Sequence, residues 1–265
     1  MKEYEAALWL SGELSISAGV KNKLFLHFGS SLSVFNAGKE EFIESGILKE
    51  DRVKALLKGR EAADPSNLSK KLSDRGIGFT YIGAKDYPAR LRNINDAPFG
   101  LYYKGDLSVT SKNCVAIVGA RRCSGYGRSK SRKIAGELSD NGIVVISGMA
   151  GGIDGEAHRG VMESGGSTVA VLGCGVDICY PASNRDIYDK ITNNGCLISE
   201  YAPGTAPRPI FFPERNRIIS GLSEAVLVIE ARHHSGSLIT ANLALSQNRD
   251  VWALPGRVED PLSHG

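Results

Sequence analysis

The second half of the chain alternates between short apolar runs and amphipathic stretches. The apolar runs occupy residues 115–118, 143–146, 168–172, 196–199, 225–229 and 251–254. Strands that are apolar on both faces are typical of parallel sheets covered by helices. The pattern therefore predicts an α/β fold with a doubly wound, mostly parallel, Rossmann-like sheet.

The first sixty residues have a different pattern. Apolar residues such as Leu24, Phe25 and Phe28 recur with helical spacing, and glycines separate the segments. This predicts a small all-helical domain over residues 1–62, followed by an extended Rossmann-like domain over residues 63–265. Two β-rich runs between residues 76 and 106 predict a pair of strands leading into the larger domain.

Composition and net charge limit the kinds of ligand and location that the sequence predicts. The net charge is only +3, so affinity for a polyanion has to come from local clusters of Lys and Arg. The N-terminus has no apolar run typical of a signal peptide, which predicts a cytoplasmic protein. The five cysteines form no CxxC pair and no zinc-site spacing. We therefore expect neither disulfides nor a bound metal or cofactor.

Ligands of doubly wound sheets bind at the carboxyl ends of the strands, so the loops there carry the functional signal. The first, "VAIVGARRCSGYGRS", does not match the glycine spacing of a dinucleotide site, and it lacks the Lys-Ser/Thr pair of a phosphate-binding P-loop. Arg121 and Arg122 precede a predicted helix, which suits a phosphate group. They serve equally well as helix-capping or surface-paired arginines.

The second loop, "ISGMAGGIDGEAHRG", contains Gly148, Gly151 and Gly152, which allow close approach of a ligand. Asp154 and His158 lie four residues apart on one helix face and suggest acid/base or metal chemistry. No third ligand accompanies them, and a buried hydrogen bond between the two explains the pair equally well. In the third loop, "YPASN" predicts a turn and a helix N-cap.

The fourth loop, "APGTAPRPIFFPERNR", combines prolines, aromatic residues and arginines. It is predicted to present Arg208, Phe211 and Phe212 from an extended segment, and Arg215, Asn216 and Arg217 from a helix that begins at Glu214. Aromatic rings that stack on bases, next to arginines that bind phosphates, are typical of single-stranded nucleic-acid sites. Alternatively, one of the two phenylalanines belongs to the core.

The fifth loop, "EARHHSGSLITAN", places Ser235, Gly236 and Ser237 at a helix start suited to anions. Together the loops predict a cationic groove along one edge of the sheet. Its candidate DNA-binding residues are Arg121, Arg122, Gly148, Gly151, Arg208, Phe211, Phe212, Arg215, Asn216, Arg217, Ser235, Gly236 and Ser237. No catalytic residue is predicted.

Several ordered motifs resemble the DNA-processing protein A (DprA/Smf) family over residues 76–261. They include "VAIVGARRCSGYG", "SGMAGGID", "TVAVLGCGVDICYP", "FPERNRIISGLS" and "VWALPG". The helical N-terminus resembles the family's sterile-alpha-motif-like domain. The resemblance implies a non-enzymatic protein of natural transformation that binds and protects single-stranded DNA and loads the RecA recombinase. It also implies a homodimer formed through the Rossmann-like domain.

The family's DNA-contacting arginine falls on Arg121, with Ala120 in place of the usual hydroxyl residue. Gly151 stands where the family has another arginine, so the resemblance implies a less cationic second loop. The family's basic and aromatic contacts correspond to Arg208 and to Phe211 or Phe212. Many members continue beyond the "PG" strand, so we expect that a segment found in those members is missing here.

A nucleotide-processing enzyme similar to nucleoside-monophosphate phosphoribohydrolases is the alternative function. Those enzymes share a glycine-rich loop on a related sheet, but their PGGxGTxxE motif does not occur in this chain. A nicotinamide-dependent dehydrogenase is disfavoured by the glycine spacing.

Overall fold

The computed structural model describes all residues from 1 to 265. The chain forms two compact units, one of residues 1–87 and 95–102 and the other of residues 88–94 and 103–265. In the first unit, α6 (Pro65–Asp74) and β1 (Gly78–Tyr81) pack against the first helix. The division at residue 62 therefore stays a prediction, since the compact unit extends past it.

The first unit is mainly helical, as the spacing of its apolar residues predicts. Its helices before α6 are α1 (Glu3–Gly12), α2 (Ala18–Phe28), α3 (Ser31–Asn36), α4 (Lys39–Glu44) and α5 (Glu50–Glu61). Leu8, Leu24 and Phe42 are fully buried and form part of its core. The predicted pair of strands is also present, as β1 and β2 (Gly100–Gly105); the short helix α7 (Ala89–Arg92), which lies between them in the chain, belongs to the second unit.

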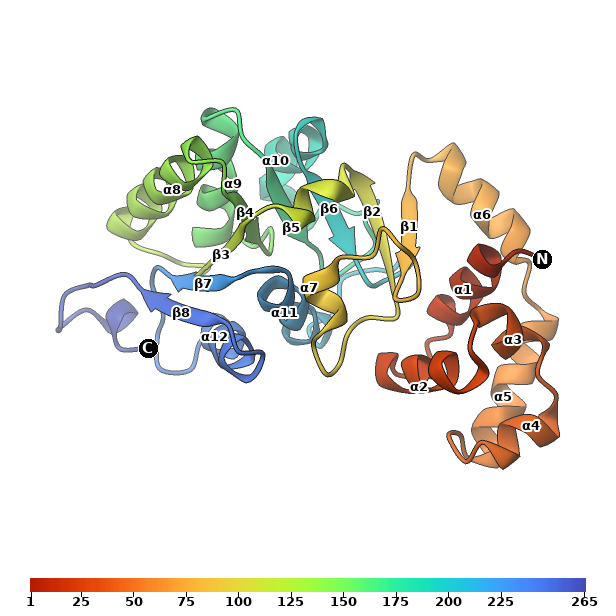
Figure 1. Ribbon diagram of the computed structural model, residues 1–265. Coiled ribbons are helices and arrows are strands. Elements are labelled where there is room, and N and C mark those ends of the chain that lie inside the picture. The colour runs from red at the N-terminus through yellow and green to blue at the C-terminus, as the bar shows by residue number, and fades with distance from the viewer. The chain divides into compact units, whose positions relative to one another are not determined.

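The second unit contains six parallel strands that neighbour one another in the sheet (Figure 1). They are β3 (Cys114–Val118), β4 (Val144–Ser147), β5 (Thr168–Val171), β6 (Cys196–Ser199), β7 (Ala225–Val228) and β8 (Asp250–Ala253). Their order is β6-β5-β4-β3-β7-β8, and every pair between neighbours is parallel. All six predicted apolar runs are strands, and every residue of β3, β4, β5 and β6 is buried.

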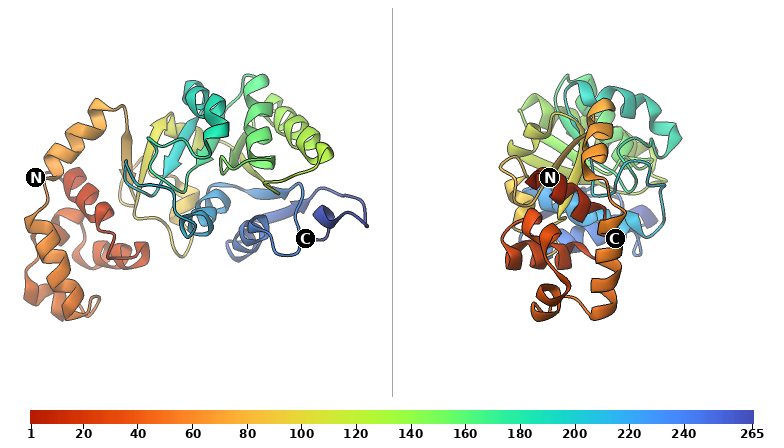
Figure 2. Two further views of the ribbon diagram at one scale, coloured as in Figure 1. Left: turned by 180° about the vertical axis from the view of Figure 1, so that it is seen from behind. Right: turned by 90° about the vertical axis from the view of Figure 1, so that its right-hand side faces the viewer.

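Helices cover both faces of this sheet. They are α8 (Gly125–Asp140), α9 (Ile153–Glu163), α10 (Arg185–Lys190), α11 (Phe211–Leu222) and α12 (Gly236–Ser246). Figures 1 and 2 show α8, α9 and α10 on one face and α11 and α12 on the other. The apolar core under α8 and α9 includes Ile117, Val145 and Ala157. The doubly wound, Rossmann-like class is thus confirmed for this unit.

The strand order places a topological switch point between β3 and β7. From β3 the chain winds through β4 and β5 to β6, and then returns to the other side of β3 as β7. The loops after β3 and β7 consequently leave the sheet in opposite directions and open a crevice, which is where such sheets bind ligands. None of the helices combines the length and the apolar character that a membrane span needs.

Candidate nucleic-acid interface

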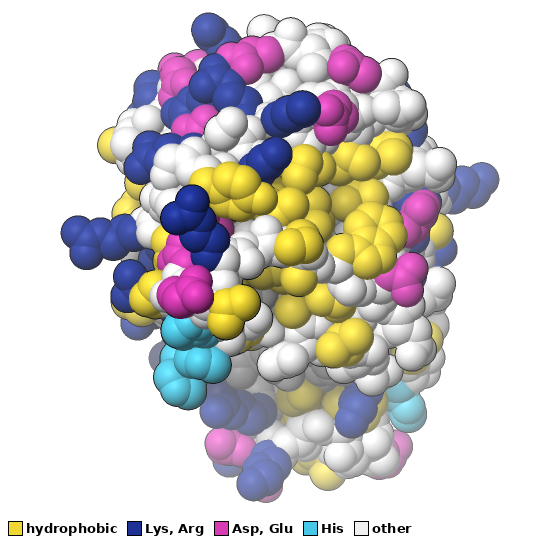
Figure 3. Space-filling model, turned by 90° about the vertical axis from the view of Figure 1, so that its left-hand side faces the viewer, with side chains coloured by type: hydrophobic (Ala, Val, Ile, Leu, Met, Phe, Trp, Pro, Cys, Tyr) yellow, Lys and Arg dark blue, Asp and Glu magenta, His cyan; other side chains and the backbone are white.

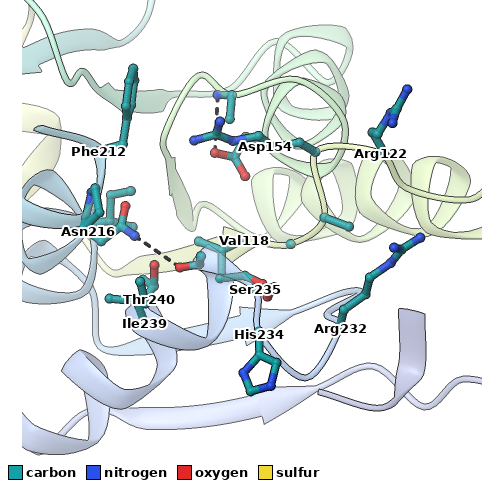
Figure 4. Close-up of a pocket in the computed structure, with 18 of the residues that line it drawn as sticks. Val118, Arg122, Asp154, Phe212, Asn216, Arg232, His234, Ser235, Ile239 and Thr240 are labelled. Carbon is teal, nitrogen blue, oxygen red and sulfur yellow. Dashed lines mark hydrogen bonds between the residues drawn. The ribbon is translucent and has the colours of Figure 1, made fainter. Parts of the chain in front are cut away.

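A pocket of about 400 Å³ opens at the switch point between β3 and β7. Its walls come from the loops after those two strands and from the starts of α9, α11 and α12. Figure 4 shows Phe212 and Asn216 on one side of the pocket and Arg122 and Arg232 on the opposite side. The pocket therefore has an aromatic side and a cationic side.

Three exposed arginines line the pocket. Arg121 and Arg122 follow β3, and Arg232 follows β7. None of the three forms an ion pair with a carboxylate. Their positive charges are thus available to an anion at this edge of the sheet. Arg232 was not among the DNA-binding residues predicted from the sequence, although it belongs to the fifth loop, "EARHHSGSLITAN".

The N-terminus of α12 forms another part of the pocket wall. The Ser235 side chain does not cap the helix, because its hydroxyl lies 2.5 Å from the hydroxyl of Ser237. Ser235, Gly236 and Ser237 all line the pocket. An uncapped helix start leaves N–H groups and a partial positive charge for an anionic ligand.

The loop over residues 148–152 is held from inside by two buried charged side chains. Arg215 is only 4% exposed and donates hydrogen bonds from Nη1 to the carbonyls of Gly148, at 2.6 Å, and of Val171. The Asp154 carboxylate accepts from the backbone N–H groups of Gly148, at 3.2 Å, and Ala150, at 3.3 Å. The N–H and the carbonyl of Gly148 are therefore each held by a buried side chain, the first by Asp154 of α9 and the second by Arg215 of α11.

The charges of this pair depend on one another. Burial lowers the pKa of Arg215 to about 10, and Asp154 opposes that shift, so Arg215 is a cation at neutral pH. Burial raises the pKa of Asp154, and the nearby Arg215 charge and the two N–H donors oppose this rise.

The burial of Arg215 and Arg217 corrects the expectation that the first turn of α11 presents both to a ligand. Arg217 is 8% exposed and donates to both oxygens of the Glu200 carboxylate at 2.8 Å. The helix begins at Phe211 rather than at Glu214. Arg215 consequently shares its helix face with the buried Ile218 and Leu222, a spacing that was visible in the sequence.

Asn216, in contrast, lies in the pocket wall and joins two elements. Its side-chain amide donates to the carbonyl of Gly236, 3.3 Å away, and so links α11 to the start of α12 (Figure 4).

Each of the two phenylalanines is half-buried between an aromatic ring and an arginine. The Phe212 ring lies 5.5 Å from that of Tyr180, and the Arg121 guanidinium lies 5.4 Å from the Phe212 centroid. Phe212 lines the pocket, whereas Phe211 does not. An arginine held over a ring keeps a positive charge beside an aromatic surface.

Phe211 has the same arrangement outside the pocket. Its ring stacks on Tyr201 at 4.1 Å, and the Arg208 guanidinium lies 5.6 Å from its centroid. Arg208 is exposed. Arg208 and Phe211 thus extend the aromatic and cationic surface beyond the pocket.

Only glycine fits at positions 148 and 152, because neighbouring atoms lie too close for a side chain. Gly152 has a φ of 74°, and a Cβ there would lie 2.4 Å from the carbonyl oxygen of Ala120. A Cβ on Gly148 would lie 2.5 Å from Nη1 of Arg215. A Cβ on Gly151 would meet only the Arg121 carbonyl oxygen, at 3.9 Å, so this position has room for a side chain.

Asn184, the last residue of the predicted "YPASN" turn, occupies the N-cap position of α10, but its side chain does not cap the helix. Its side-chain amide instead donates to the carbonyls of Met149, at 2.9 Å, and Ala150, at 3.0 Å. Asn184 is therefore another support of the glycine-rich loop.

The Asp154 and His158 pair does not form the hydrogen bond considered from the sequence. His158 Nδ1 lies 2.8 Å from Oγ1 of Thr168, and Asp154 bonds the loop backbone. No group of three or more His, Cys, Asp or Glu side chains is placed to hold a metal ion. The two side chains are separate structural supports: Asp154 holds the glycine-rich loop, and His158 contacts Thr168 of β5.

The buried His158 predicts a pH dependence of stability. Burial, with the charges of Arg215 and Arg159, lowers the pKa of His158 from 6.5 to about 3. Between these values the unfolded chain binds a proton that the folded chain does not, so stability falls as the pH drops through this window. His158→Asn keeps a group facing Thr168 but cannot titrate. We expect the parent to lose more unfolding free energy than this variant between about pH 7 and 4 in urea titrations. Parallel pH profiles would contradict the assignment.

Known proteins match the chain over most of its length. The profile of a family described as DNA recombination-mediator protein A matches residues 78–265. DNA processing protein DprA of Streptococcus pneumoniae is 46% identical over 179 residues, which is 68% of this chain and 63% of that protein. DprA of Bacillus subtilis is 41% identical over 72% of this chain and 65% of that protein. The matched regions span just under two thirds of these two relatives.

Two solved structures are similar as well. The X-ray structure of DprA from Streptococcus pneumoniae has a TM-score of 0.86 and 35% identity, and covers 99% of this chain and 90% of that one. A structure described as revealing the single-stranded DNA binding mode of DNA processing protein A from Helicobacter pylori has a TM-score of 0.64 and 30% identity. It covers 69% of this chain and 83% of that one.

Proposed function

Because the chain belongs to the DNA recombination-mediator protein A family, we propose that it binds single-stranded DNA in the pocket at the switch point. One observation carries the proposal: unpaired Arg122 and Arg232 lie across a single pocket from Phe212, and Arg121 lies over the Phe212 ring. Phosphates bind the arginines and the start of α12, and bases stack on the aromatic side. The described binding mode of the Helicobacter pylori relative supports this ligand class.

In this proposal the predicted contact residues have two roles. Arg121, Arg122, Ser235, Gly236 and Ser237 bind phosphate groups, while Phe212, Asn216, Arg208 and Phe211 form the surface that the bases contact. Gly148, Gly151 and Arg217 shape and support the site instead of binding DNA through their side chains, and Arg215 supports the loop through Nη1.

We further propose that the protein acts in natural transformation, where it protects incoming single strands and loads RecA onto them in the cytoplasm. The description of its family as recombination mediators supports this role. The protein acts by binding, without catalysing a reaction. The phosphoribohydrolase-like alternative is not favoured, because the chain lacks the PGGxGTxxE motif.

The proposed function predicts a preference for single strands. The site is a pocket with loops and stacked rings, not a basic helix that fits a major groove. A labelled oligothymidylate of about 20 nucleotides should therefore bind about tenfold or more tightly than a duplex of equal length at the same salt concentration. Equal affinities would refute the proposal. Release of free base from nucleoside monophosphates would refute the absence of catalysis.

We also propose that the protein forms a homodimer through α12 and β8. The strand β8 is the last in the sheet order, and three of its four residues are exposed. Leu245 and Trp252 are 60% and 50% exposed. Figure 3 shows hydrophobic side chains gathered on the face at this end of the sheet. An open sheet edge beside a broad apolar surface fits a second copy of the same chain.

Leu245→Asp is expected to convert the dimer to a monomer, because it places a charge in an apolar interface. Light scattering at micromolar concentration should give twice the chain mass of 28.4 kDa for the parent and the single mass for the variant. Leu14→Asp is the matched control, since Leu14 is 79% exposed and belongs to the other unit. A monomeric parent, or a dimeric Leu245→Asp variant, would rule out this interface.

A further inference from the structure

We propose that the pocket binds one whole nucleotide that ends in a phosphomonoester, with the phosphate at the start of α12 and the base on the opposite side. This inference rests on the proposed function, because the same pocket is assigned to DNA. The chemistry has two sources, the 5′-phosphorylated end of a strand and a free nucleoside 5′-monophosphate.

The size and depth of the pocket favour a single nucleotide. Its volume of about 400 Å³ is in the range of sites that enclose small ligands. Part of its lining is buried, namely the side chains of Asp154, Ser237 and Thr240. A strand that passed along an open groove would not need a recess with buried polar groups, whereas a terminal nucleotide can enter one.

The cationic side of the pocket fits a phosphomonoester. The eleven-residue helix α12 begins here without a side-chain cap, and Arg232 lies nearby in the wall. A second, independent observation is Arg215, which lines the pocket and is 4% exposed, and whose Nε has no hydrogen-bond partner. A monoester carries more charge than the diester inside a strand, so it gains more from these positive groups.

The opposite side of the pocket fits a base. Phe212 and Ile219 contribute apolar and aromatic surface to the lining. Figure 4 places Phe212 away from Arg122 and Arg232. A nucleotide has the same division, with a flat apolar base at one end and a charged phosphate at the other.

The test compares oligothymidylates that differ only in a 5′-phosphate or 5′-hydroxyl end. We expect the phosphorylated strand to bind about tenfold more tightly, which corresponds to about 1.4 kcal/mol. Free thymidine 5′-monophosphate should displace it, while thymidine and inorganic phosphate should each be at least about tenfold weaker competitors. Arg232→Ala should abolish the advantage of the phosphorylated end. Arg257→Ala, which removes an exposed arginine outside the pocket lining, should keep it.

The outcomes separate this inference from the proposed function. If both strands bind equally and the monophosphate does not compete, the nucleotide site is refuted while single-strand binding stands. If neither strand binds, both proposals fail. If the phosphorylated end keeps its advantage in Arg232→Ala, and thermal melts show that the variant is folded, the assignment to this pocket is wrong.

Discussion

Replacing Arg215 with methionine is expected to lower the free energy of unfolding by about 3 to 5 kcal/mol. The variant keeps much of the side-chain volume but removes the cation that lies near the buried Asp154. It also leaves the carbonyls of Gly148 and Val171 without their donor. Urea unfolding of the parent and the variant measures this difference.

The double variant Arg215→Met with Asp154→Asn isolates the contribution of charge. Because it removes both charges, its loss of stability should be smaller than the sum of the two single losses. Arg257→Met is the exposed control and should change stability by no more than about 0.5 kcal/mol. A single Arg215→Met variant within about 1 kcal/mol of the parent would contradict the supporting role of Arg215.

Replacing Arg121, Arg122 and Arg232 together with alanine is expected to weaken binding to oligothymidylate about 100-fold at 0.1 M salt. When the logarithm of the affinity is plotted against the logarithm of the salt concentration, each phosphate contact on a single strand makes the slope steeper by about 0.7. Three lost contacts reduce this slope by about 2. Anisotropy titrations at several salt concentrations measure both quantities.

A control variant with the same net charge uses cations outside the pocket. Lys133, Arg185 and Lys190 are exposed and do not line it, so their joint replacement by alanine should leave the salt slope nearly unchanged. If both triple variants lose the same affinity and slope, general charge attracts the strand and the pocket does not bind it.

The sheet could be predicted from the sequence because each strand is recognisable from a few consecutive residues. Each buried strand is a continuous apolar run, such as residues 115–118, and each is followed by an amphipathic stretch. Parallel strands then bring the loops that contain Arg121 and Ser235 to one edge. The cationic character of the site follows from those loops alone.

The supports of the site could not be predicted, because they join segments far apart in the chain. Arg215 bonds the carbonyl of Gly148, 67 residues away, and Asn184 reaches Met149, 35 residues away. No local spacing signals such bonds. An arginine at a helix start beside other arginines was interpreted as exposed, although its face contains Ile218 and Leu222.

The pairing of Arg121 with Phe212 is also a tertiary feature. From the sequence one was assigned to phosphate and the other to a base, whereas the guanidinium lies over the ring. The two residues therefore form one surface, and substitutions at them are expected to be coupled.

Hydrogen exchange with and without oligothymidylate tests the location of the DNA site most directly. Backbone amides of residues 119–124, 148–152 and 232–240 should exchange more slowly when the strand is bound, because each of these segments contains residues that line the pocket. The helices α1 to α5 should be unchanged. The account would be contradicted if the strand binds but exchange in these three segments stays unchanged and other segments become protected.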